Sequence, residues 1–117
     1  MNFESNCVVR TLAEIMDRPA AEIVAEISKY SNHKGGPAFT PDGGCALWAY
    51  GQFLESLGWT WRHCQIDGIE IPSTALIEVE GHVFGLLRGR LIDTFECADY
   101  SLGEICGVWT PPSEAVR

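Results

Sequence analysis

The hydrophobic pattern of this chain changes once, near its midpoint, and the change restricts the possible folds more than any other feature. Before Gly58, apolar residues recur every three or four positions, the spacing of one buried helix face. From Trp59 onward, apolar and polar residues tend to alternate, as they do in half-buried strands. Helices followed by strands indicate an α+β fold, with N-terminal helices packed on one face of an antiparallel β-sheet.

We expect three helices and a meander of short strands. The helices are expected over residues 6–16, 19–30 and 44–57, and a Gly- and Pro-rich loop over 31–43. The strands are expected over residues 59–66, 74–80, 82–88, 90–95 and 107–111. Gly81 and Gly89 separate consecutive strands and favour hairpins. Since no linker or repeat interrupts the pattern, residues 1–117 are expected to form a single domain.

Charge and hydropathy exclude several classes of function. The net charge is -8, with eight Lys and Arg against sixteen acidic residues, so the chain lacks the basic face that a nucleic-acid binder needs. No apolar run is long enough to cross a membrane, and no secretory signal opens the chain. We therefore expect a cytoplasmic protein, or one cut from a longer precursor, with neither nucleic-acid nor membrane partners.

The five cysteines form no CxxC pair and are expected to be free thiols in a reducing compartment. The histidines are scattered, and only His63 and Cys64 adjoin one another as possible zinc ligands. Tetrahedral zinc sites usually contain local pairs of ligands, so this alternative is not favoured. We expect neither a metal nor another cofactor.

Cys7 lies where a reactive thiol would be placed. Ser5 and Asn6 are both good N-cap residues, and Cys7 follows them inside the first helical turn. The unpaired N–H groups and the dipole of a helix N-terminus favour a thiolate, which is the nucleophilic form of cysteine. The same N–H groups can hold the oxyanion of a tetrahedral intermediate.

A base and an orienting group occur together later in the chain. His82 begins one expected strand and Asp93 lies in the next. If Arg88 and Gly89 form a two-residue turn, His82 and Asp93 project from the same face, one diagonal step apart, about 7–8 Å between backbones. A three-residue loop would place Asp93 on the opposite face.

These residues fall within stretches that resemble small papain-like cysteine peptidases, including compact phage and bacterial forms. The matching stretches are "NCVVRTLA" (6–13), "GW" (58–59), "GHVFGLLRGRLIDTF" (81–95) and "VW" (108–109). The resemblance implies a papain-like fold with Cys7 as nucleophile, His82 as base and Asp93 as orienting residue, acting on a peptide or protein substrate.

The resemblance is incomplete around the nucleophile. Such peptidases usually carry Asp immediately before the cysteine, whereas this chain has Asn6. Papain-like enzymes also use an upstream Gln or Asn to support the oxyanion, and only Asn2 and Asn6 are available here. Asn6 has the alternative role of N-cap.

Other interpretations remain open. Cys45, in "DGGCALWAY", also begins an expected helix and is a rival nucleophile. The same triad would also suit an acyl transferase or a deamidase. The acidic charge suits a binding protein without turnover, such as a phage-encoded inhibitor that covers a basic surface of a host protein. The four tryptophans are expected to lie in the core, with Trp59 or Trp109 near the cleft.

Overall fold

The computed structural model describes residues 6–30, 38–39, 45, 47–63, 72–79, 82–92 and 105–112. The helices are α1 (Cys7–Met16), α2 (Ala20–Ser28) and α3 (Leu47–Ser56). The strands are β1 (Thr60–His63), β2 (Ala75–Val79), β3 (His82–Leu87), β4 (Arg90–Ile92) and β5 (Ile105–Thr110). The expected α+β order is therefore confirmed. The loop expected over 31–43 lies outside the described residues except at 38 and 39.

Helix α1 has well-defined signals at both ends. Asn6 is its N-cap, with φ -60° and ψ 141°, and the Asn6 side chain accepts a hydrogen bond of 2.9 Å from the Val8 N–H. Asp17 ends the helix in the left-handed conformation, at φ 53°. Between these caps Val8, Val9 and Leu12 are buried and belong to the core that the helices share with one face of the sheet.

The five strands form one antiparallel sheet in the order β1-β5-β2-β3-β4. Strands β2, β3 and β4 form the expected meander, but β5 inserts between β1 and β2. The expectation of a simple meander is therefore wrong for β1 and β5. The strand expected over 107–111 also begins earlier, at Ile105, and its pairing with β2 shifts register between Glu78 and Val79.

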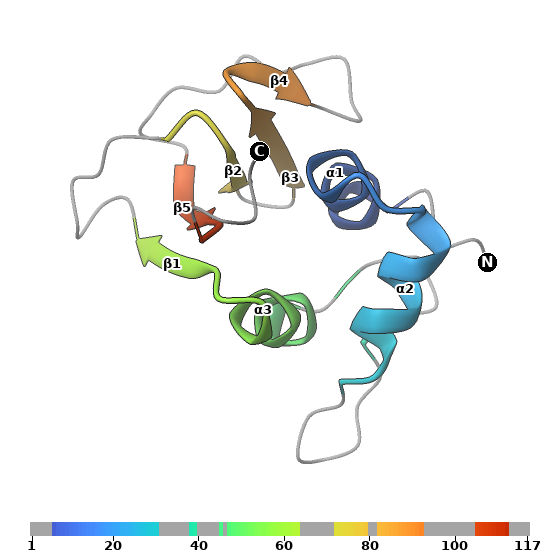
Figure 1. Cartoon of the computed structure of the whole chain (residues 1–117). Coiled ribbons are helices and arrows are strands. Elements are labelled where there is room, and N and C mark those ends of the chain that lie inside the picture. Colours follow the sequence, from blue (N-terminus) through green and yellow to red (C-terminus); the bar gives the residue numbers. More distant parts are fainter. Residues whose placement is uncertain are drawn as a thin grey trace.

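The two faces of the sheet contribute to two separate cores. One face packs against the helices and includes Leu76, Val83 and Trp109. The other face carries a second apolar cluster of strand residues: Ala75, Ile77, Val79, Phe84, Ile105 and Val108. Figure 1 shows α1 beside β3 and α3 beside β1, on the same side of the curved sheet. No helix in the described part of the chain has the length and apolar character needed to span a membrane.

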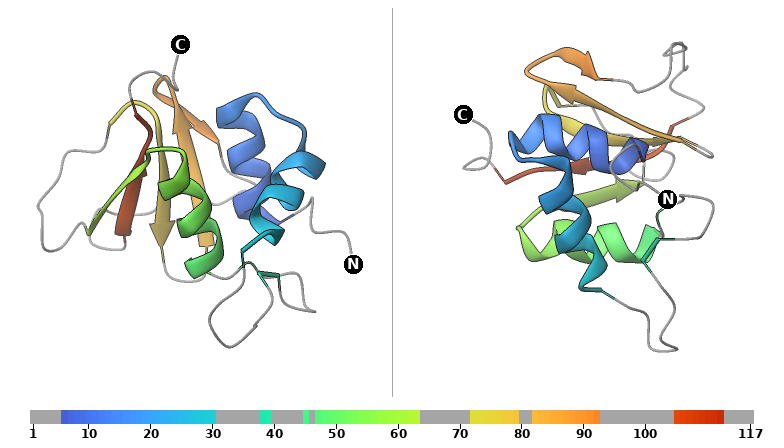
Figure 2. Two further views of the ribbon diagram at one scale, coloured as in Figure 1. Left: turned by 60° about the horizontal axis from the view of Figure 1, so that its bottom comes forward. Right: turned by 90° about the vertical axis from the view of Figure 1, so that its right-hand side faces the viewer.

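Helix α1 and strand β3 lie side by side and run in the same direction (Figure 2). A Cβ built at Gly85 would lie 2.6 Å from Thr11 Cγ2 and 3.1 Å from Ile15 Cδ1, so the glycine allows close approach of the helix. Further along the same direction, Arg90 Nη2 of β4 lies 3.8 Å from Glu14 Oε2. Both contacts place the C-terminal half of α1 against the β3–β4 hairpin.

Candidate active site

Cys7 is the first residue of α1 and is partly buried against the helix-side core. The chain folds this way locally because Asn6 caps the helix one residue earlier. The N-cap role that the sequence offered for Asn6 is therefore the one its side-chain oxygen fulfils. The Cys7 side chain consequently lies in the field of the helix N-terminus, which favours an anionic form of the thiol.

His82 is the first residue of β3 and is buried, with 8% of its surface exposed. It shares a sheet face with Phe84, and the centroids of the two rings are 6.4 Å apart. Helix α1 packs on the opposite face, the one that carries Val83 and Gly85. Strand alternation thus directs His82 to the face away from α1, which the sequence did not reveal.

Cys7 and His82 nevertheless occupy the same end of the α1–β3 pair. Thr11 and Ile15 flank Gly85, so the contact is centred at position 13 of α1. That position is six residues from Cys7, or about 9 Å at a helical rise of about 1.5 Å per residue. His82 precedes Gly85 by three residues, or about 10 Å at a strand rise of about 3.3 Å. Cys7 and His82 therefore lie at similar distances from the Gly85 contact, in the same direction along α1 and β3. A path between their side chains passes the N-terminal end of β3.

The described pairing of β3 differs between its two ends. In the described part of the chain, β4 pairs only with Gly85, Leu86 and Leu87. His82 pairs with Val79 of β2 on the other side.

The β3–β4 turn has the two-residue form on which the placement of Asp93 depends. Arg88 and Gly89 have φ values of 52° and 82°, the positive pair typical of a type I′ hairpin. The Arg88 N–H donates to Thr74 Oγ1 at 3.0 Å, and the Gly89 N–H to the Ser73 carbonyl at 2.8 Å. These bonds hold a non-glycine residue in a left-handed conformation.

The observed register is the one predicted from a two-residue turn. Leu87 faces Arg90, and Gly85 faces Ile92. The expected pairing of Phe84 with Asp93 lies one residue beyond this ladder. Asp93 itself lies outside the described residues, as does Asn2.

Cys45 lies beside Cys7 and has the properties of an unreactive thiol. It is half-buried and pairs with Phe39 in an isolated β-bridge. Burial, and secondly the nearby charge of Cys7, raise the pKa of Cys45 to about 12. At neutral pH the Cys45 thiol is therefore protonated. The structure therefore disfavours Cys45 as the nucleophile and leaves it as a neutral neighbour of Cys7.

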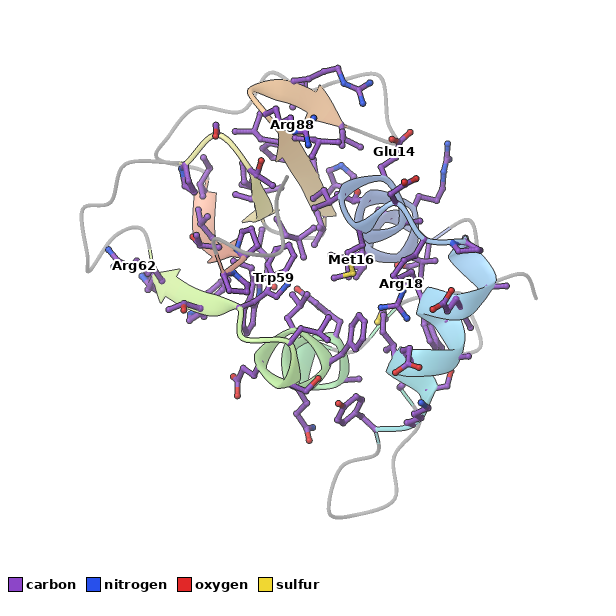
Figure 3. The ribbon with its side chains drawn as sticks, viewed as in Figure 1. Glu14, Met16, Arg18, Trp59, Arg62 and Arg88 are labelled. Atoms are coloured by element: carbon purple, nitrogen blue, oxygen red, sulfur yellow. The ribbon has the colours of Figure 1, made fainter. Side chains whose placement is uncertain are left out.

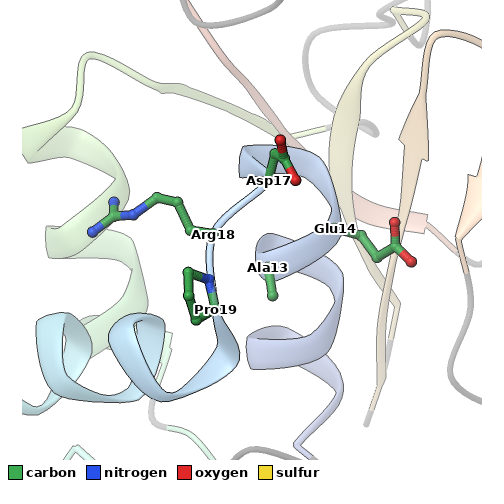
Figure 4. Close-up of a pocket in the computed structure, with 5 residues that line it drawn as sticks. All are labelled: Ala13, Glu14, Asp17, Arg18 and Pro19. Carbon is green, nitrogen blue, oxygen red and sulfur yellow. The ribbon is translucent and has the colours of Figure 1, made fainter.

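Two further features concern possible ligands. Among the described residues no group of three His, Cys, Asp or Glu side chains is arranged to hold a metal ion. The alternative zinc pair cannot be followed, because Cys64 is outside the described residues. A surface hollow of about 580 Å³ is lined by Ala13, Glu14, Asp17, Arg18 and Pro19 (Figure 4). This hollow lies at the C-terminal end of α1, whereas Cys7 is at the N-terminal end. The described residues that line it include neither Cys nor His.

The sequence analysis missed a cluster on the helix-facing surface of the sheet, beside α3 and away from α1. Trp61, which was expected in the core, has 36% of its surface exposed, and it borders a cavity with Trp109 and Glu78. Alternation within each strand places these residues on the helix side, but only the position of β5 brings them together.

Comparison with models of protein families, with curated proteins and with solved structures finds no match for this chain.

Proposed function

We propose that this protein is a papain-like cysteine hydrolase that cleaves a peptide, isopeptide or related amide bond in a peptide or protein substrate. The observation that carries the proposal is the position of Cys7. It opens helix α1, and α1 lies along the strand that His82 begins, with both starting at the same end. Free thiols suit a cytoplasmic location, which is part of the proposal.

The proposed reaction uses each group for one step. His82 removes the Cys7 proton, and the Cys7 thiolate attacks the substrate carbonyl carbon. N–H groups at the start of α1 stabilise the resulting oxyanion. His82 returns its proton to the leaving amine, so that an acyl-enzyme remains on Cys7. Water, deprotonated by His82, then releases the carboxylic acid, while Asp93 orients the imidazole.

Two neighbours modify the environment of Cys7 in this scheme. The Asn6 oxygen is engaged by the Val8 N–H, so any support of the oxyanion by Asn6 would come from its amide nitrogen. Asn2 is the other candidate for that support. Cys45 remains protonated beside Cys7, which leaves a single thiolate in the site.

The proposal makes a geometric demand on His82. Since strand alternation directs its side chain away from α1, the imidazole must turn past the N-terminal end of β3 to reach the Cys7 sulfur. A catalytic pair requires a separation near hydrogen-bond reach, about 3–4 Å with a loose resting geometry. The pH dependence of Cys7 reactivity reports whether this approach occurs in solution.

The test is alkylation with iodoacetamide between pH 5 and 9, with each cysteine followed by peptide mass spectrometry. We expect Cys7 to react rapidly at pH 6–7, and His82→Asn to move its profile to that of an ordinary thiol, with a pKa of about 8.5. Cys106 is exposed and serves as an internal reference. A Cys7 profile that follows Cys106 and ignores His82→Asn would refute the proposal.

A second candidate is an acidic binding protein without turnover, for instance an inhibitor of a host protein. The observation that favours it is the net charge of -8 together with the acidic, tryptophan-lined cavity. An inert Cys7 in a protein that still binds a basic partner tightly would support this candidate. Acyl transfer or deamidation by the same triad would be recognised from the products.

A further inference from the structure

A second cavity lies between α3 and the sheet, and its lining has a distinctive chemistry. Its volume is about 220 Å³, and its walls are Glu55 of α3, Trp61 of β1, Glu78 of β2 and Trp109 of β5. Pockets for drug-sized ligands usually measure about 300–1,000 Å³, so this cavity has room for a single side chain or a small ion. Two aromatic rings and two carboxylates are the groups that surround organic cations in proteins.

The two tryptophans form a wedge. Trp61 pairs with Trp109 across β1 and β5, and their ring centroids are 5.3 Å apart with an angle of 50° between the planes. A Cβ built at Gly107 would run into the six-membered ring of Trp61, so the glycine leaves room for that ring. On the other side, Trp109 packs against Gly51 of α3, where a built Cβ would lie 3.3 Å from its ring. Trp109 is thus fixed, whereas Trp61 is at the surface.

Glu78 faces the two tryptophan rings, and its hydrogen bond from Trp109 compensates only partly for the solvation that its carboxylate loses on burial. It lies beside Gly107 in the β2–β5 ladder, and Trp109 Nε1 donates a hydrogen bond of 3.3 Å to Glu78 Oε1. Burial raises the pKa of Glu78, and the Trp109 hydrogen bond lowers it by a smaller amount. A half-buried carboxylate with a neutral donor is stabilised further when a cation approaches.

No cationic side chain of the described residues lines the cavity. Arg62, the neighbour of Trp61, points outward from β1 (Figure 3). Arg18, just before α2, is paired with Glu22, and Lys29, just after α2, is paired with Glu26. Among the described residues, none supplies a positive charge that would complement Glu55 and Glu78, and a cation from another molecule would supply it.

We propose that this cavity binds the ammonium group of a lysine side chain presented by a peptide or protein partner. The ammonium group would lie against the indole rings of Trp61 and Trp109, close to the carboxylates of Glu78 and Glu55. A compact ammonium suits a wedge of two inclined rings, whereas a planar guanidinium stacks best on one flat face. The net charge of -8 would steer a basic segment toward the protein. This inference does not depend on Cys7.

The test uses the full chain with Cys7→Ser, which prevents turnover, and the capped tripeptide acetyl-Gly-Lys-Gly-amide as the probe. Binding is followed through the indole N–H signals in ¹H–¹⁵N correlation spectra. We expect saturable shifts of the Trp61 and Trp109 signals and none with the Nε-acetylated peptide. Glu78→Gln, which retains an acceptor for Trp109, should weaken binding about tenfold or more.

Two further variants separate the pocket from general charge effects. Gly107→Ala should displace the Trp61 ring and abolish the saturable shifts, while Glu14→Gln, an equal change of charge outside the cavity, should leave the affinity within about twofold. Equal binding of the acetylated peptide, tighter binding of an arginine peptide, or affinity unchanged by Glu78→Gln would each overturn the proposal. Because no step involves Cys7, these results are independent of the alkylation test.

Discussion

Replacing Gly85 with alanine would test how α1 is held against β3. The new Cβ would lie 2.6 Å from Thr11 Cγ2, 3.1 Å from Ile15 Cδ1 and 3.3 Å from the Ala75 carbonyl oxygen. Carbon atoms pack best at about 3.5–4.0 Å, so Thr11 would have to move by about 1 Å. The helix must shift away from the strand or the strand must bend, because Thr11 is fully buried.

Two opposing contributions determine how much Gly85→Ala changes the free energy of unfolding. Overpacking a core by one methyl group costs about 1–3 kcal/mol. Alanine in place of glycine recovers about 0.5–1 kcal/mol, since it restricts the unfolded chain. The difference between these terms spans about 0–2.5 kcal/mol, and the severity of the 2.6 Å contact places the expected loss in the free energy of unfolding at about 1–2 kcal/mol. This corresponds to a fall in Tm on the order of 4–8 °C.

Urea unfolding of four proteins measures this effect: the parent, Gly85→Ala, Thr11→Ser and the double variant. Thr11→Ser removes the Cγ2 methyl that obstructs the new Cβ, so the double variant should be more stable than the sum of the single changes predicts. A Gly85→Ala protein as stable as the parent, or strictly additive changes, would refute the proposed packing of α1 on β3. If α1 also positions Cys7, Gly85→Ala should slow Cys7 alkylation at pH 6–7.

Three further predictions follow from local features. Asn6→Ala should lower the free energy of unfolding by about 0.5–2 kcal/mol through loss of the cap, and Asn6→Asp should retain it; equal stability of the two variants would contradict the capping role. Cys45, with a pKa of about 12, should resist iodoacetamide in the native protein up to pH 9 and react only after unfolding, as peptide mapping would show. Because the folded pKa of Glu78 is raised above 4.5, its ionisation destabilises the fold progressively as the pH rises through that range. Glu78→Gln should therefore increase stability in urea at pH 7 and give no comparable gain at pH 4; the reverse dependence would be inconsistent with a raised pKa.

Much of the local structure was predictable because it depends on neighbours within a few residues. The change of periodicity at Trp59 separates helices from strands, Asn6 caps the helix that contains Cys7, and Arg88–Gly89 forms the two-residue turn. Each of these follows from steric and hydrogen-bonding preferences of short segments. They were sufficient to predict an α+β fold and the register of the β3–β4 hairpin.

The arrangement around Cys7 depended on packing between distant segments. Nothing near Cys45 in the sequence indicates that its thiol lies beside Cys7, because residues 8–44 separate them. The orientation of His82 depends on which face of β3 receives α1, and Gly85 decides this by admitting Thr11. Alternation along a strand defines two faces, but only tertiary packing determines which one the helix covers.

The sequence by itself therefore determined the order of helices and strands, the hairpin turn and the position of Cys7 at a helix start. Tertiary structure alone decided that β5 lies between β1 and β2. This position of β5 is what brings Trp61, Trp109 and Glu78 together. The physical reason is that a turn or a cap is selected by the conformations open to a few adjacent residues. The partner of a strand is instead selected by the burial of whole faces, which involves every segment of the chain together.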